Sequence, residues 1–273
     1  MKVKEIPISL FQSLRLRILS KKRLIKNEPK VPVIVSLATI PSRLHIVHIT
    51  VRSILNQSVV PKKIILWLHE DLKTKVPKKL AKLQGEFFEI RFSKLTSSHR
   101  KLVNTLKIYP ELAILTCDDD MIYRKNWLNN TYNSHLENST AIIANQVRCI
   151  SYDNDEVLPY TKWNTMGDAC KNHLALLPIG AGGTLYPPNS LHEDVLDSEL
   201  FLKLTPTTDD LWFKAMSLKK ETISIFSKYP IRKPIPILGS QVVSLKKGNI
   251  KEDKNRVQWK NVADYYKLHE LVK

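Results

Sequence analysis

Length, composition and charge exclude several kinds of protein at the outset. The chain has 273 residues, of which 43% are hydrophobic, so it can bury one substantial core. Its 43 Lys and Arg against 26 Asp and Glu give a formal net charge of +17, which favours nucleic acid, anionic lipid or phosphorylated substrates as partners. No stretch has the roughly 18 to 20 continuous apolar residues of a spanning helix, and no cleaved signal is apparent, so we expect a cytoplasmic protein.

The three cysteines suggest no metal or redox centre. Cys117, Cys149 and Cys170 are odd in number, widely spaced, and form no C-x-x-C pattern. We expect all three to be reduced and structural.

The first segment, residues 1–30, is a basic arm with nine Lys and Arg. Apolar residues recur within it at approximately helical spacing, namely Ile8, Phe11, Leu14, Ile18 and Leu19. This pattern predicts a basic amphipathic helix, for which two interpretations stay open. The helix lies on an anionic membrane surface, or it packs on its own domain and leaves a solvated basic face.

Beyond Pro32, apolar β-branched runs alternate with helical patterns. Strands are predicted at 33–37, 64–68, 88–92, 112–116 and 141–147, and helices at 44–55, 76–84, 100–108 and from about 209. Such alternation is typical of an α/β domain with a mainly parallel sheet flanked by helices, which binds ligands at the carboxyl ends of its strands. We assign this domain to residues 31–228 and expect residues 229–273 to form a C-terminal extension packed on it.

Three consecutive carboxylates, Asp118, Asp119 and Asp120, follow the strand at 112–116. Because adjacent carboxylates repel one another, a divalent cation would stabilise them at the end of an apolar strand. Mg²⁺ and Mn²⁺ accept one or two carboxylates and keep positions for phosphate oxygens. The alternative is a solvated acidic turn or helix cap. The position directly after a buried strand favours the metal site.

A second acidic pair, Asp209 and Asp210, precedes an apolar helical run. In one interpretation Thr208 or Asp209 simply caps that helix. In the other, a carboxylate faces an acceptor hydroxyl and acts as a general base or orients the acceptor. The sequence leaves both interpretations open.

Glycines and isolated cations add further candidates. Three of the seven glycines are Gly180, Gly182 and Gly183, which indicates either close approach to a ligand or a tight turn. Arg43, after the first strand, and Lys101, before the Asp triplet, lie at the expected ligand edge. Each is alternatively a solvated surface charge.

Five segments, in the same order, resemble a family of bacterial glycosyltransferases with the GT-A (Rossmann-like) fold. They are residues 35–44, 53–58, 116–120, 182–188 and 208–213, and the resemblance covers roughly residues 33 to 215. In that family an Asp-x-Asp motif binds Mn²⁺ or Mg²⁺ and the nucleotide sugar. The resemblance therefore implies that Asp120 and Asp118 are metal ligands and that Asp118 and Asp119 contact the nucleotide sugar.

The resemblance also implies roles outside the triplet. Asp210 corresponds to the second acid of a late dyad that contacts or deprotonates the acceptor, and Asp209 stands where Glu is more common. The remaining expectations are that Arg43 and Lys101 bind nucleotide or phosphate, that Gly182 and Gly183 border the donor sugar, and that Trp163 stacks on a sugar. Neither His192 nor His269 lies in a matching motif, so neither is assigned as a third metal ligand.

The implied activity is that of a metal-dependent, hexosyltransferase-like enzyme. It would move a sugar from a nucleoside diphosphate sugar, UDP-linked in the first instance, to a glycan or glycolipid acceptor in lipopolysaccharide or capsule synthesis. It would work in the cytoplasm or as a peripheral protein on the inner face of the cell membrane, with no nucleic-acid partner. Two alternatives are a basic nucleic-acid-binding protein, which no recognised motif supports, and a metal-dependent phosphoryl-transfer enzyme, for which the chain lacks a G-x-x-x-x-G-K-[ST] loop.

Overall fold

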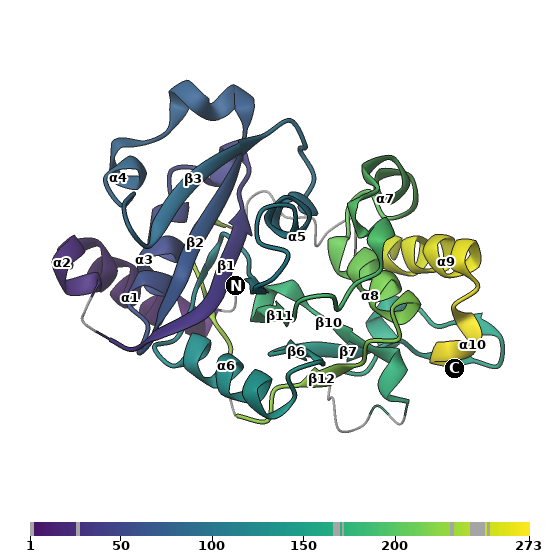
Figure 1. Ribbon diagram of the computed structural model, residues 1–273. Helices are drawn as coiled ribbons and strands as arrows, with labels where there is room; N and C mark the ends of the chain where they lie inside the picture. The colour runs from purple at the N-terminus through teal and green to yellow at the C-terminus, as the bar shows by residue number, and fades with distance from the viewer. Residues whose placement is uncertain are drawn as a thin grey trace.

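A seven-stranded sheet with the order β12-β6-β11-β4-β1-β2-β3 forms the centre of the fold (Figure 1). The computed structural model describes residues 3–25, 28–165, 170, 172–229, 232–240, 249 and 252–273. Six strands run parallel: β1 (Lys30–Ala38), β2 (Val60–His69), β3 (Phe88–Ser93), β4 (Ala113–Thr116), β6 (Ile142–Ala144) and β12 (Ser224–Phe226). Only β11 (Thr184–Tyr186) runs antiparallel to its neighbours, β4 and β6. The predicted α/β class with a mainly parallel sheet is confirmed.

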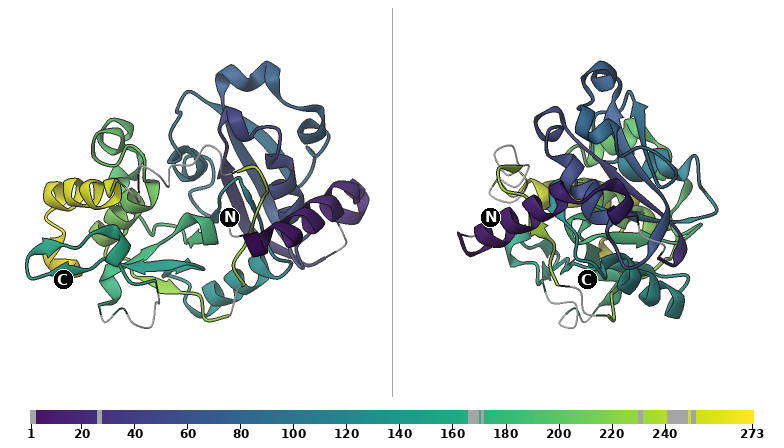
Figure 2. Two further views of the ribbon diagram at one scale, coloured as in Figure 1. Left: turned by 180° about the vertical axis from the view of Figure 1, so that it is seen from behind. Right: turned by 90° about the vertical axis from the view of Figure 1, so that its left-hand side faces the viewer.

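Helices cover both faces of the sheet, because side chains alternate along the central strands. In β1, Val33 and Val35 join one apolar cluster, and Ile34 joins the other. The first cluster includes residues of α1 (Ile6–Ile18), α2 (Lys21–Leu24), α3 (Val47–Leu55), α4 (Lys78–Ala81) and α6 (Trp127–Glu137). The second includes residues of α5 (Arg100–Leu106), α7 (Ser198–Leu204), α8 (Asp209–Lys219), α9 (Lys254–Tyr266) and α10 (His269–Val272). The helices α1 and α9, which belong to different clusters, lie at opposite ends of the molecule (Figure 2).

Short two-stranded pairs complete the architecture. They are β5 (Met121–Ile122) with β13 (Ile235–Pro236), β7 (Val147–Cys149) with β10 (Leu176–Pro178), and β8 (Tyr152–Asp153) with β9 (Glu156–Val157). In the C-terminal segment, α9 packs on α8 and buries Trp259 and Val262 completely. Within the described ranges, no helix is both long and apolar enough to cross a bilayer.

Two predicted elements differ from the observed ones. The helix predicted at 76–84 reaches only from Lys78 to Ala81, after Pro77 at its N-cap. The strand predicted at 141–147 is broken after Ala144, where the side-chain amide of Asn145 donates to the Thr131 hydroxyl (2.7 Å). The chain therefore leaves the main sheet at Asn145 and enters the β7–β10 pair.

The expectation that all cysteines are reduced is wrong. Cys149, at the end of β7, forms a disulfide with Cys170, 21 residues along the chain, while Cys117 is free and buried. Sequence spacing could not show this pair, since the chain between them folds back on itself through β8 and β9.

Candidate active site

The reversed strand β11 brings the glycine segment to the Asp triplet. Thr184, the first residue of β11, lies opposite Thr116, the last residue of β4. The residues before β11 therefore lie at the same sheet edge as the residues after β4. In a fully parallel arrangement they would lie at the opposite edge. This register places Gly180 beside Asp118.

Arg43 neutralises two members of the triplet. Its guanidinium lies 2.8 Å from Asp119 Oδ1 and 3.2 Å from Asp120 Oδ2, and all three side chains are largely buried. Thr39, at the end of β1, also donates a hydrogen bond to Asp119. Burial raises the pKa of Asp119 even beside Arg43, while the two carboxylates raise the pKa of Arg43 although burial opposes it. Arg43 is thus a buried counterion rather than a solvated charge.

Lys101 joins the two acidic motifs. From the first turn of α5, its buried ammonium lies 3.2 Å from Asp118 Oδ1 and 3.1 Å from Asp209 Oδ2. Burial would lower the pKa of Lys101, but the carboxylates of Asp209 and Asp118 raise it well above its usual range. Burial likewise opposes ionisation of Asp209, and Lys101 holds the pKa of Asp209 below its usual value. Two motifs about 90 residues apart in sequence therefore share one cation.

Asp210 faces the glycine segment. Its two carboxylate oxygens accept from the backbone N–H of Gly180 at 3.2 and 3.1 Å. A Cβ at position 180 would lie 3.0 Å from Asp210 Oδ1 and 3.2 Å from Lys101 Nζ, so only glycine fits without movement. Burial and the adjacent Asp209 carboxylate raise the pKa of Asp210.

The acidic pair is more than a helix cap. Asp209 and Asp210 are the first two residues of α8, where carboxylates interact favourably with the helix dipole. The N-cap residue Thr208 makes no side-chain capping bond, and its hydroxyl instead donates to Asn255 Oδ1 (2.8 Å). Lys101 and Gly180 take up the two carboxylates, so both acids have partners outside their own helix.

Tyr123 is a residue of the site that the sequence did not indicate. Its buried hydroxyl accepts from the Asp118 N–H (3.0 Å) and donates to the Ala181 carbonyl (3.1 Å). It therefore links the triplet directly to the glycine segment. A tyrosine three residues after an acidic triplet has no distinguishing pattern, so no sequence signal could have found it.

Gly182 and Gly183 owe their identity to packing. A Cβ on Gly182 would lie 2.6 Å from the Gln146 side chain, and one on Gly183 would lie 2.6 Å from the Trp127 ring. Gly183 also has a φ of +96°, which side chains rarely tolerate. Both glycines therefore shape the loop that carries Gly180. Their expected contact with a donor sugar stays a prediction.

Trp163 and His269 have their partners in other parts of the chain. Trp163 is 1% exposed and its indole N–H donates to the Leu158 carbonyl (2.9 Å), so the prediction that it stacks on a sugar is wrong. His269 Nδ1 pairs with the Tyr152 hydroxyl (2.9 Å) at the C-terminal end of the chain.

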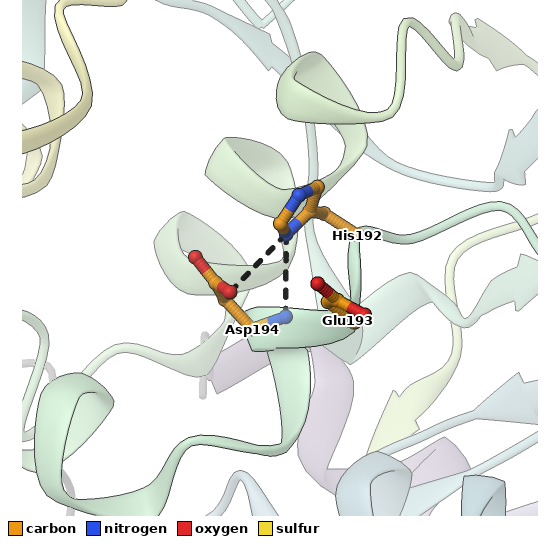
Figure 3. A group of neighbouring side chains, drawn as sticks. All are labelled: His192, Glu193 and Asp194. Carbon is orange, nitrogen blue, oxygen red and sulfur yellow. Dashed lines mark hydrogen bonds and ion pairs between the residues drawn. The ribbon is translucent and has the colours of Figure 1, made fainter.

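His192 belongs to a separate cluster with Glu193 and Asp194, whose ligand atoms all lie within 4.8 Å (Figure 3). His192 Nδ1 accepts from the Asp194 N–H at the start of a short 3-10 turn. The Asp194 carboxylate is already taken up by Lys219 and the Tyr266 hydroxyl, each at 2.7 Å. These contacts describe a capped turn that is bonded to α8 through Lys219 and to α9 through Tyr266, and we assign no metal to it.

The charge of the main site suits one divalent cation. Burial and Asp209 raise the pKa of Asp210 to about 8, so near pH 7 the ionised acids are Asp118, Asp119, Asp120 and Asp209. They face three cations, Arg43, Lys101 and the nearby Arg100, so the formal charge is −1. Asp118 has a side chain 34% exposed, the highest value among the ion-paired acids of the site, and Lys101 pairs with one of its oxygens. A hard cation arriving from solvent would meet Asp118 first.

Comparisons with known proteins leave the family open. No family model and no curated protein matches the chain. One solved structure that it resembles is 4-diphosphocytidyl-2C-methyl-D-erythritol synthase from Anaerococcus prevotii, with 13% identity, a TM-score of 0.47, and coverage of 87% of this chain and 99% of that chain. A similarity this distant says nothing about the chemistry of the present protein.

Proposed function

We propose that this protein is a metal-dependent glycosyltransferase of the GT-A type that uses a nucleoside diphosphate sugar, UDP-linked in the first instance. One observation carries the proposal: Lys101 bridges Asp118 and Asp209, while Asp210 binds Gly180. The triplet, the glycine segment and the late acidic pair, which are far apart in sequence, thus meet at the carboxyl edge of a mainly parallel sheet. Ligands of such sheets bind at that edge.

The residues divide into ligands, counterions and a base. Asp118 and Asp120 would hold Mn²⁺ or Mg²⁺, which supplies a positive charge for the diphosphate leaving group. Asp210 would accept the proton of the acceptor hydroxyl, or orient that hydroxyl. Arg43 and Lys101, expected from the sequence to contact nucleotide, are better suited to keeping the buried acids ionised and in position.

The acceptor and location belong to the same proposal. We assign a glycan or glycolipid of the bacterial surface, such as lipopolysaccharide or capsule, with the protein acting at a membrane surface. The basic composition is compatible with nucleic acid too, but the charged groups at the carboxyl edge of the sheet are predominantly acidic, which disfavours a phosphate backbone as the ligand of this site.

The decisive experiment is a panel of nucleotide sugars tested with and without Mn²⁺ for protection against thermal unfolding. We expect stabilisation by one donor only when Mn²⁺ is present, by about 2.7 kcal/mol at a ligand concentration one hundred times Kd. Asp120→Ala should abolish this Mn²⁺-dependent binding in calorimetric titration, since Arg43 keeps Asp119 as a partner and the fold survives.

The matched control is Glu199→Ala, which removes an exposed carboxylate on α7 and should leave binding unchanged. Unaltered Mn²⁺-dependent binding by folded Asp120→Ala would refute the metal assignment. Failure of every nucleotide sugar, with Mn²⁺ or Mg²⁺, would refute glycosyl transfer from such donors.

A further inference from the structure

Helix α1 packs on the domain through a face that combines small polar residues with Leu16 and the partly buried Ile8. Ser9, Ser13 and Leu16 are its buried residues, and Leu16 is 1% exposed. Arg52 of α3 donates from Nε to the Leu16 carbonyl (2.5 Å), and the Ser9 hydroxyl donates to the Pro236 carbonyl (2.7 Å). These contacts fix the orientation of the helix about its own axis.

The outward face of α1 is apolar. Leu10, Leu14 and Ile18 are spaced four residues apart, and Phe11 lies three residues before Leu14, so the four side chains form one stripe. Their exposed fractions are 51%, 63%, 74% and 61% for Leu10, Leu14, Ile18 and Phe11. A contiguous stripe of large exposed apolar side chains on one helix is unusual for a surface that only meets water.

Cationic hollows lie on both flanks of this stripe. Arg15 lines one hollow of about 230 Å³ together with Arg124 and Lys125. Arg17 lines another of about 350 Å³, whose other cations are Lys21, Arg52, Lys79 and Lys82. His48 also lines the second hollow, and its buried Nε2 atom has no hydrogen-bond partner among the described residues. In the larger hollow Arg52 and Lys21 already donate to backbone carbonyls, so Arg17, Lys79 and Lys82 are its cations best suited to attract a phosphate group.

We propose that α1 docks on an anionic lipid bilayer, with its apolar stripe in the boundary between headgroups and acyl chains and lipid phosphates in the two hollows. An apolar stripe flanked by cations is the arrangement that binds such a surface. A second copy of this chain is a poorer occupant, because it would bring the same cations against these cations. The sequence left two interpretations open for the basic arm, a helix on a membrane or a helix packed on its own domain. Helix α1 packs on its domain and also presents an apolar face to solvent.

The inward face of α1 is linked to the candidate active site through residues 235–240. Ser9 accepts from the N–H of Leu238 (3.0 Å), and in the same segment, residues 235–240, Ile237 donates to the Asp120 carbonyl (2.9 Å). The carbonyl of Ser240 accepts from Arg43 Nε (3.2 Å). Docking through α1 would therefore hold the site near the bilayer surface, where a lipid-linked acceptor is found.

The test uses the full chain and needs neither donor nor acceptor, so its outcome is separate from that of the proposed activity. Binding is measured by flotation with vesicles of phosphatidylcholine, with and without about one-third phosphatidylglycerol, at low and high salt. We expect binding to the anionic vesicles that weakens with salt. The double variant Phe11→Ser/Leu14→Ser should bind at least roughly tenfold more weakly, because it removes two inserting side chains.

The matched control is Leu136→Ser on α6, where the leucine is 61% exposed, and it should bind like the wild type. Lys79→Gln/Lys82→Gln, in the larger hollow, should weaken binding more than Lys203→Gln/Lys220→Gln, which lie outside it. Equal vesicle binding by the Phe11/Leu14 variant would overturn the proposal. So would a wild-type protein that ignores lipid charge, or one whose stripe is covered by self-association in solution.

Discussion

At the scale of single residues, buried charges in this protein differ in whether they have a partner. Arg43 and Lys101 lie between carboxylates, whereas Lys214 of α8 is 1% exposed and its ammonium has no hydrogen-bond partner among the described residues. The sequence indicated the acids of the candidate site but not these pairings. Lys101 and Asp209 are separated by more than a hundred residues, so only the folded chain shows that they meet.

Asp210→Asn tests the most specific part of the proposed mechanism. Asn keeps the size of the side chain but cannot accept a proton, so donor binding should persist while transfer falls by roughly 10²- to 10⁴-fold. Steady-state kinetics with the identified donor and acceptor measure the effect. If Asp210 only orients the acceptor, the loss will appear mainly in KM for the acceptor.

The control for that variant is Asp197→Asn, because Asp197 caps α7 and Asn caps a helix equally well. It should transfer sugar at the wild-type rate. Wild-type kinetics in correctly folded Asp210→Asn would instead show that Asp210 only accepts the hydrogen bond of Gly180 and has no role in sugar transfer.

Lys214 should make stability depend on pH. Burial lowers the pKa of Lys214 from 10.5 to about 7, so between these values the unfolded chain binds more protons than the folded one. The free energy of unfolding should therefore rise with pH from about 7 to 10.5, and the penalty should be full below that window. Lys214→Met should remove this dependence and stabilise the protein at pH 7 by roughly 1 to 4 kcal/mol. Urea unfolding at several pH values measures both effects, and a Lys214→Met protein with an unchanged pH slope would contradict the prediction.

At the scale of elements, hydrophobic periodicity predicted the first half of the sheet well. The runs at 33–37, 64–68, 88–92 and 112–116 all lie within or overlap β1, β2, β3 and β4, because buried parallel strands are nearly continuous apolar runs. The direction of β11 was not predicted. Three residues, Thr184–Tyr186, are too few to show periodicity, and their direction is set by pairing with β4 and β6.

The disulfide between β7 and Cys170 should stabilise the segment that it closes. We expect one free thiol per unfolded chain without reductant and three with it, as counted by thiol titration. Cys149→Ser/Cys170→Ser should lower the free energy of unfolding by about 3 kcal/mol, the value for a loop of this length. Cys117→Ala, which keeps the disulfide, should leave no free thiol in unreduced protein. Three free thiols in the unreduced wild type would show that the bond does not form.

At the scale of the whole molecule, the acids of the candidate site and the cations beside α1 lie on different elements. The acids gather at the carboxyl edge of the sheet, and the cations of α1, α3 and α4 surround the apolar stripe. Composition alone predicted a polyanionic partner, but a net charge of +17 does not say where on the protein that partner would bind. The fold places a group of cations beside the apolar stripe of α1, where the proposed bilayer would supply the polyanion.

The bridge made by Lys101 has a consequence for how the site responds to its ligands. Because the ammonium already holds Asp118 and Asp209 together, little entropy remains to be lost when a cation enters. At the proposed metal site, an entering ion would compete with Lys101 for Asp118 and would not have to bring distant loops together. The entropic cost of bringing the acids together would thus be met during folding. The remaining cost of metal binding would be the replacement of the Lys101 ammonium by the metal ion at Asp118.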